Sequence, residues 1–208
     1  MVITMKDRLR TKSFGHVVTK VKMEVNGIKL TDKKDNEIKN TYNTILDFFA
    51  NKPMQGGCHF FSAAMYILLQ EQDIICNLMI GEVKDDSFPT SFSHSWVEID
   101  EQVYDIAIMF PHYMEGQPPV FAGIDLDNSE KSTRKYGIND KLRIDDKVAQ
   151  NAFNLSVSDY LDGHPQGKDY LWKDIFKMGK RILKDKTIEE LRETYKDRKR
   201  VLKLIKEN

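Results

Sequence analysis

The residue best suited to act as a nucleophile is Cys58, which follows two glycines and opens an apolar stretch ending at Leu69. A segment that is apolar on all sides predicts a helix buried in the core. A thiol at the start of a helix meets unpaired N–H groups and the positive end of the helix dipole, and both stabilise its thiolate. Gly56 and Gly57 allow the backbone to approach a substrate closely. This arrangement predicts a reactive thiol, whereas most free cysteines are small core residues.

Two side chains that could assist a thiol lie on a predicted β-hairpin. The hairpin comprises two strands, 92–99 and 102–109, and a tight turn at Asp100–Glu101. In this register Ile99 pairs with Gln102, and His94 lies opposite Ala107. Side chains two apart in a strand share a face, so His94 and Asp105 become diagonal neighbours about 7 Å apart. A slip of one residue would move Asp105 to the opposite face.

Cys58, His94 and Asp105 together have the chemistry of a catalytic triad. The imidazole can take the thiol proton and later protonate the leaving group, while the carboxylate orients the imidazole and stabilises its charged form. The backbone N–H of Cys58 could supply one oxyanion donor. The other candidates for the oxyanion and the cleft are Gln55, Gly57 and Trp96. These side-chain types predict nucleophilic catalysis by a cysteine.

Three short motifs resemble those of the transglutaminase-like superfamily. Gly56–Ala63 (GGCHFFSA) is similar to its G-x-C-x-x-[FWY]-[AS] nucleophile motif. His94–Glu98 (HSWVE) is similar to its H-[AS]-W-V-E strand, and Tyr104–Ile106 resembles its motif of an aromatic residue followed by Asp. The resemblance covers about residues 36–110 and keeps the order Cys, His, Asp.

By this resemblance the fold is α+β and papain-like, with a catalytic helix packed on an antiparallel sheet. The implied activity is acyl transfer through a thioester on Cys58, acting on an amide bond of a peptide or a glutamine side chain. The family includes peptidases, deamidases and acyltransferases, so a protein or peptide substrate is expected, with a small amide or thioester as the alternative. The runner-up is a catalytically inactive module of the same fold that binds a protein or peptide. The calcium dependence of animal relatives is not implied, because no calcium loop pattern occurs.

The neighbouring thiol and imidazole have simpler interpretations. His59 is adjacent to Cys58, and adjacent helix residues point about 100° apart, so it is a poor base. Cys76 lies in an apolar segment and is expected to be an inert core thiol. A zinc site at Cys58, His59 and His94 lacks a C-x-x-C or H-x-x-x-H pair, and no metal or other cofactor is expected.

The rest of the chain is expected to complete one core domain and a helical extension. Residues 1–165 form the predicted core domain, and 166–208 the C-terminal extension packed on it. Within the core, the apolar residues of 17–25 followed by Asn26–Gly27 indicate a hairpin, and Asp35 is expected to cap a helix. That helix has the predicted apolar face Ile38, Tyr42, Ile45, Leu46 and Phe49.

Beyond the motifs, irregular structure is expected, followed by two helices. Residues 111–163 are predicted to border the cleft and to hold a short helix near 148–153. The extension is predicted to contain helices over 168–183 and from a capping box at Thr187–Glu190 onward, the second with an apolar stripe from Ile188 to Ile205.

Composition limits the class of protein and its partners. Lys+Arg and Asp+Glu both number 32, but residues 166–208 carry 14 basic against 8 acidic residues, a net charge of +6. A docked helix with a solvated basic face explains this excess better than nucleic-acid binding does. Two cysteines cannot make a disulfide framework, and Met1–Arg8 lacks the apolar region of a signal peptide. A cytoplasmic protein with no membrane partner is therefore expected.

Overall fold

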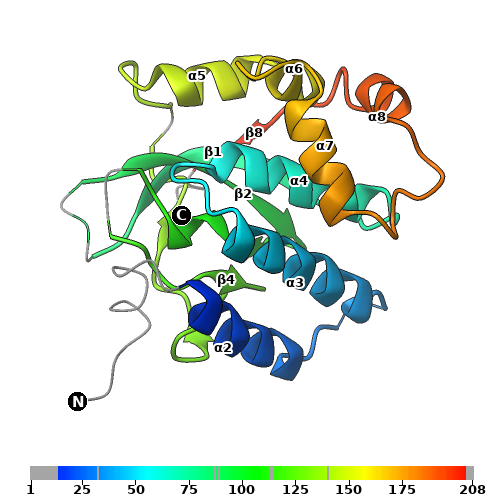
Figure 1. Cartoon of the computed structure of the whole chain (residues 1–208). Coiled ribbons are helices and arrows are strands. Elements are labelled where there is room, and N and C mark those ends of the chain that lie inside the picture. The colour runs from blue at the N-terminus through cyan, green and yellow to red at the C-terminus, as the bar shows by residue number, and fades with distance from the viewer. Residues whose placement is uncertain are drawn as a thin grey trace. The chain divides into compact units, whose positions relative to one another are not determined.

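The computed structural model describes residues 14–31, 33–86, 88, 90–112, 115–139 and 141–204 (Figure 1). These residues form two compact units. Unit 1 contains the described residues up to Cys76 and those of Trp96–Ser132, and unit 2 contains the remaining described residues. The boundary falls inside strand β2 (Phe92–Ile99), directly after Ser95. Both units contain helices and strands, so the expected α+β class is confirmed. The predictions for Met1–Arg8 concern residues outside the described part of the chain.

Helix α2 (Phe14–Gly27) in unit 1 occupies the segment for which the sequence predicted a hairpin, and that prediction is wrong. The buried valines of α2 are Val17, Val18, Val21 and Val25. Three of them recur every four residues, which is the spacing of a helix face and not of a strand. The helix packs against α3 (Asp35–Asn51), as Figure 1 shows. Burial on α3 therefore outweighs the low helix propensity of valine.

Helices α3 and α4 follow the sequence prediction closely. The expected apolar face of α3 is buried: Ile38, Tyr42, Ile45, Leu46 and Phe49. Asp35 is the first helical residue and not the cap, because Lys34 occupies the N-cap position without a side-chain bond. In α4 (Cys58–Gln70), the residues from Cys58 to Leu69 are buried on all sides, as predicted.

The predicted turn and register of the hairpin are confirmed. Strand β3 (Gln102–Tyr104) runs antiparallel to β2, and Ile99 pairs with Gln102. The turn residues Asp100 and Glu101 have φ angles of 48° and 62°. Positive φ at both positions is the geometry of a type I′ hairpin turn.

The second strand of the hairpin ends earlier than predicted. Asp105 forms a single antiparallel bridge to Val120, and Ala107–Met109 form the 3-10 helix η1. The predicted strand over 102–109 is therefore wrong beyond β3, and so is the pairing of His94 with Ala107. The backbone of Asp105 instead pairs with Val120, 15 residues further along the chain.

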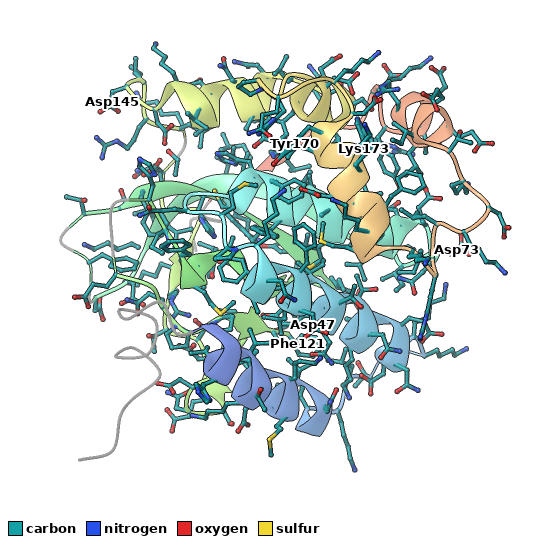
Figure 2. All side chains as sticks on the ribbon, viewed as in Figure 1. Asp47, Asp73, Phe121, Asp145, Tyr170 and Lys173 are labelled. Carbon is teal, nitrogen blue, oxygen red and sulfur yellow. The ribbon has the colours of Figure 1, made fainter. Side chains whose placement is uncertain are left out.

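A small antiparallel sheet in unit 1 anchors this bridge. Its strands are β4 (Val120–Phe121), β5 (Ile124–Asp125) and β6 (Glu130–Lys131). The ring of Phe121, labelled in Figure 2, packs edge-on against the rings of Tyr42 and Tyr104, with centroids 5.0 Å apart in both pairs. The Tyr42 hydroxyl also donates to the carbonyl of Val120 at 2.9 Å. These contacts hold β4 against α3.

Strand β1 (Asn77–Lys84) is the centre of the sheet in unit 2. Its residues from Leu78 to Val83 are all buried, as expected for a strand covered on both faces. It is a neighbour of β2, pairs antiparallel with β7 (Lys135–Tyr136) and pairs parallel with β8 (Val201–Leu202). The expected antiparallel sheet therefore gains one parallel strand from the C-terminal segment.

The helices of unit 2 are α5 (Lys147–Asn154), α6 (Val157–Asp162), α7 (Tyr170–Met178) and α8 (Ile188–Thr194). The short helix expected near 148–153 is α5, and α7 is a shorter form of the helix expected over 168–183. The predicted capping box of α8 is present: the Thr187 side chain accepts from the Glu190 N–H, and the Glu190 side chain accepts from the Thr187 N–H. Near one end of α7, the Arg192 guanidinium lies 2.9 Å from Asp162 Oδ2 and 2.7 Å from Asp169 Oδ1.

The segment after α8 differs from the prediction. The helix expected to continue toward Ile205 stops at Thr194, and the chain then forms β8; Ile205 itself lies outside the described residues. Arg200, one of the basic residues of 166–208, is buried, and its guanidinium donates to the Ala152 carbonyl at 2.9 Å. Part of the basic excess is therefore structural. The predicted domain boundary between 165 and 166 stays a prediction. None of the helices in the described part of the chain is long and apolar enough to cross a membrane.

Candidate functional site

Cys58 is the first residue of α4 and is 8% exposed. The backbone N–H groups of Phe60 and Phe61 both donate to the carbonyl of Gly57, at 3.1 and 2.9 Å, so that Gly57 is the N-cap. The predicted position of Cys58 at a helix start is therefore confirmed. The helix dipole creates a positive potential at a helix start, and such a potential favours a thiolate over a thiol.

The two glycines before Cys58 are required by the packing of the chain on itself. Gly56 has a φ of +68°, a conformation that side chains rarely adopt. A Cβ at Gly57 would lie 3.0 Å from the Met54 carbonyl oxygen and 3.1 Å from Cε2 of Phe61. The glycines therefore have a structural reason to be present, independent of the substrate approach that the sequence suggested.

The side chain of Gln55 ties the loop before α4 to the segment after η1. Its amide nitrogen donates to the carbonyls of Pro111 and His112, at 3.3 and 2.9 Å. The N–H of Gly56 donates to the carbonyl of Phe110 at 3.0 Å, which strengthens the same connection. Sequence reasoning missed this clamp, because nothing in the local pattern of residues 110–112 indicates its partner.

Asp105 is 2% exposed, and its backbone N–H and carbonyl both bond to Val120. Its N–H donates to the Val120 carbonyl and its carbonyl accepts from the Val120 N–H, both at 2.9 Å. Its carboxylate oxygen Oδ1 accepts from the N–H of Ile108 at 3.2 Å, and so shapes η1.

Trp96 is fully buried, and its indole Nε1–H donates to Glu98 Oε1 at 2.9 Å. The two residues are two apart in β2 and therefore share a face of the strand. The same alternation puts His94 on that face of β2. Sequence reasoning selected Trp96 but missed Glu98 as its anchor, although the spacing of two between them was a usable signal.

His94 lies in the part of β2 that belongs to unit 2 and is 2% exposed. Its ring packs edge-on against the ring of Phe92, with centroids 5.5 Å apart. Phe92 packs in turn against Phe88 at 5.3 Å. Ser93, which lies between Phe92 and His94 in the sequence, donates its hydroxyl to Glu82 Oε1 at 2.6 Å.

The candidate residues are divided between the two units. Unit 1 contains Cys58, Asp105, Gln55, Gly57 and Trp96, and unit 2 contains His94. Within unit 1, α4 packs against η1, the 3-10 helix to which the Asp105 carboxylate is bonded. The assembly of Cys58, His94 and Asp105 into one triad stays a prediction.

The second thiol, Cys76, has the properties expected of a core cysteine. Burial raises its pKa to about 11, and a hydrogen bond from the Gln70 amide to its sulfur, at 3.5 Å, offsets only part of that effect. His59 in α4 is also buried. Among the residues that the structure describes, no group of three or more His, Cys, Asp or Glu side chains is arranged to hold a metal ion.

Comparison with known proteins returned no match to any family model, curated protein or solved structure.

Proposed function

We propose that the chain is a cysteine-dependent acyl-transfer enzyme of the transglutaminase-like kind. Cys58 is the nucleophile, His94 the general base and acid, and Asp105 the carboxylate that orients the imidazole. The substrate is an amide, in a peptide or a glutamine side chain. The accompanying fold is papain-like, and a cytoplasmic setting suits a protein whose two cysteines are not joined in a disulfide.

The observation that carries this proposal is the place of Cys58 as the first residue of α4. A buried structural cysteine gains nothing from a helix N-terminus, whereas a thiolate gains the attraction of the helix dipole. The cysteine is also followed by a helix that is buried on all sides, which gives the sulfur a rigid support.

The register of the hairpin supports the roles of His94 and Asp105. Glu98 of β2 lies directly opposite Val103 of β3, so these two side chains share a face. Alternation along β2 assigns His94 to the face of Glu98, and alternation from Val103 assigns Asp105 to it as well. The register of β2 and β3 is therefore compatible with the proposed roles of His94 and Asp105, although β3 ends before Asp105.

The proposed reaction proceeds in two halves. His94 accepts the thiol proton as the Cys58 sulfur attacks the carbonyl carbon, and it then donates that proton to the departing amine. The product of this half is a thioester on Cys58. Water or an amine then attacks the thioester, His94 takes a proton from it, and the sulfur leaves. The Cys58 N–H is the proposed oxyanion donor. Gln55, one of the three further candidates for the oxyanion and the cleft, uses its amide nitrogen to bond two carbonyls.

Acetylation by p-nitrophenyl acetate tests the proposal, because an activated ester needs no matching amine. We expect peptide mass spectrometry to find the acetyl group on Cys58 and not on Cys76. The His94→Ala variant is expected to slow acetylation by about 10²- to 10⁴-fold, the usual contribution of a general base. The matched control is Cys76→Ala, which should acetylate at the wild-type rate. An unmodified Cys58, with the protein folded, would contradict the proposal and favour the binding module.

A further inference from the structure

A buried carboxylate lies on the strand beside His94. Glu82 of β1 is fully buried, and its Oε1 accepts a hydrogen bond from the Ser93 hydroxyl at 2.6 Å. Its other oxygen, Oε2, is also buried and has no hydrogen-bond partner among the described residues. Glu82, Ser93 and His94 all belong to unit 2, so this arrangement is complete within one compact body.

Packing alone does not account for a glutamate at this position. Ile80, two residues earlier in β1, shares the face of Glu82 and packs in an apolar cluster with Leu142, Ala149 and Ala152. A buried carboxylate with an unsatisfied oxygen is unfavourable, and a fold that retains one has a use for it beyond the core.

We infer that Glu82 and Ser93 are positioning residues for His94, an inference that rests on the proposed function. Ser93 directly precedes His94. The hydrogen bond between Ser93 and Glu82 therefore fixes the peptide that joins Ser93 to His94. On the opposite face of β2, the Phe92 ring packs against the edge of the imidazole. Contacts on both faces of β2 therefore hold the imidazole. The Phe92 ring contacts it directly on one face, and the hydrogen bond from Ser93 to Glu82 on the other face acts through the backbone.

This arrangement has a consequence for the thiol. An imidazolium stabilises a thiolate only when the ring nitrogen points at the sulfur, so a loosened imidazole raises the pKa of its partner. Removing the Ser93 hydroxyl should therefore weaken the activation of Cys58 while leaving the Cys58 and His94 side chains themselves unchanged.

The test compares Ser93→Ala with Ser93→Thr by following the alkylation of Cys58 with iodoacetamide against pH. For Ser93→Ala we expect the inflection of the Cys58 profile to move upward by about one pH unit. Well below the inflection the thiolate falls about tenfold, and the higher nucleophilicity of the more basic thiolate limits the loss of rate to about 3.5-fold. Ser93→Thr keeps a hydroxyl on the same carbon and should restore the wild-type profile. A purely structural role of the bond would change the protein's stability and leave the inflection in place.

Two controls separate this effect from general loosening. Ser158→Ala removes another serine hydroxyl of unit 2, which donates to the Arg192 carbonyl at 2.7 Å, and it should leave the profile unchanged. Cys76 reports unfolding in the same samples, because burial raises its pKa to about 11 and so suppresses its thiolate in the native state.

The outcomes distinguish the two proposals. Two results would overturn this inference and leave the proposed function intact, both with an activated Cys58 in the wild type. In one, the Cys58 profile is unchanged in Ser93→Ala; in the other, it shifts equally in Ser158→Ala. A wild-type Cys58 that titrates like a free thiol would overturn both.

Discussion

The two cysteines of the chain allow the reactivity of Cys58 to be measured against an internal reference. Cys58 and Cys76 are almost equally buried, with exposed fractions of 8% and 7%. Burial of the whole residue is therefore similar for both, and the predicted difference in their alkylation rates comes from their thiolates. The perturbation is pH, the reagent is iodoacetamide, and peptide mass spectrometry reads each cysteine separately.

The expected ratio of the two rates follows from the pKa of each thiol. Cys76, with its pKa raised to about 11 by burial, gains thiolate tenfold for each pH unit across the whole working range. If the helix start and His94 hold the pKa of Cys58 at about 6.5, the thiolate fractions differ by about 8,000-fold at pH 7. The lower nucleophilicity of the more acidic thiolate, with a Brønsted coefficient of about 0.45, removes about 100-fold. The predicted Cys58:Cys76 ratio is therefore about 70 at pH 7.

The change of this ratio with pH is the decisive observation. An activated Cys58 is already ionised above its pKa, so the ratio should fall from about 200 at pH 6 to about 10 at pH 8. A Cys58 with the ordinary pKa of about 8.5 would give a nearly constant ratio of about 20 over the same range. A ratio that does not fall between pH 6 and pH 8 would refute the assignment of Cys58 as an activated nucleophile. The His94→Ala variant, which keeps the helix start, should make the ratio fall less steeply between pH 6 and pH 8.

Two further predictions concern Asp105 and the ion pairs of α8. Asp105→Asn keeps an oxygen that can accept from the Ile108 N–H but removes the charge, so we expect a folded protein whose Cys58 acetylation is at least about 100-fold slower; a wild-type rate would make Asp105 purely structural. Arg192→Ala breaks bonds to two aspartates at a site where the arginine side chain is 17% exposed, and should lower the free energy of unfolding in urea by about 1–2 kcal/mol. Arg143→Ala is the matched control, because its pair with Asp145 is exposed and should contribute nothing measurable.

The features that the sequence determined by itself are those encoded by neighbouring residues. The buried face of α3, the burial of α4 on all sides and the extent of β2 were all predicted from periodicity within one segment. The hairpin turn and the capping box of α8 were predicted from two to four adjacent residues. Such signals are local because a helix or a turn forms its hydrogen bonds within a few residues of itself.

The errors occurred where a short segment is compatible with two structures. The valines of α2 are β-branched and favour a strand by type, while their spacing favours a helix, and packing against α3 decided for the helix. The segment after α8 continues a helical pattern in sequence but becomes β8, because β1 has an edge to which it can pair. Neither partner can be identified from the segment itself.

The candidate site shows the same division. The sequence alone determined which residues have the chemistry, namely Cys58 behind two glycines and the pair His94 and Asp105 on a hairpin. Only the tertiary structure decided what surrounds them: the clamp of Gln55 on residues 110–112, the bridge of Asp105 to Val120 and the burial of Glu82 beside Ser93. The bridge and the clamp join segments far apart in the chain, and the bond to Glu82 crosses between two strands. All of them depend on how the chain packs, because the residues next to a side chain in the sequence do not identify a partner that only folding brings close.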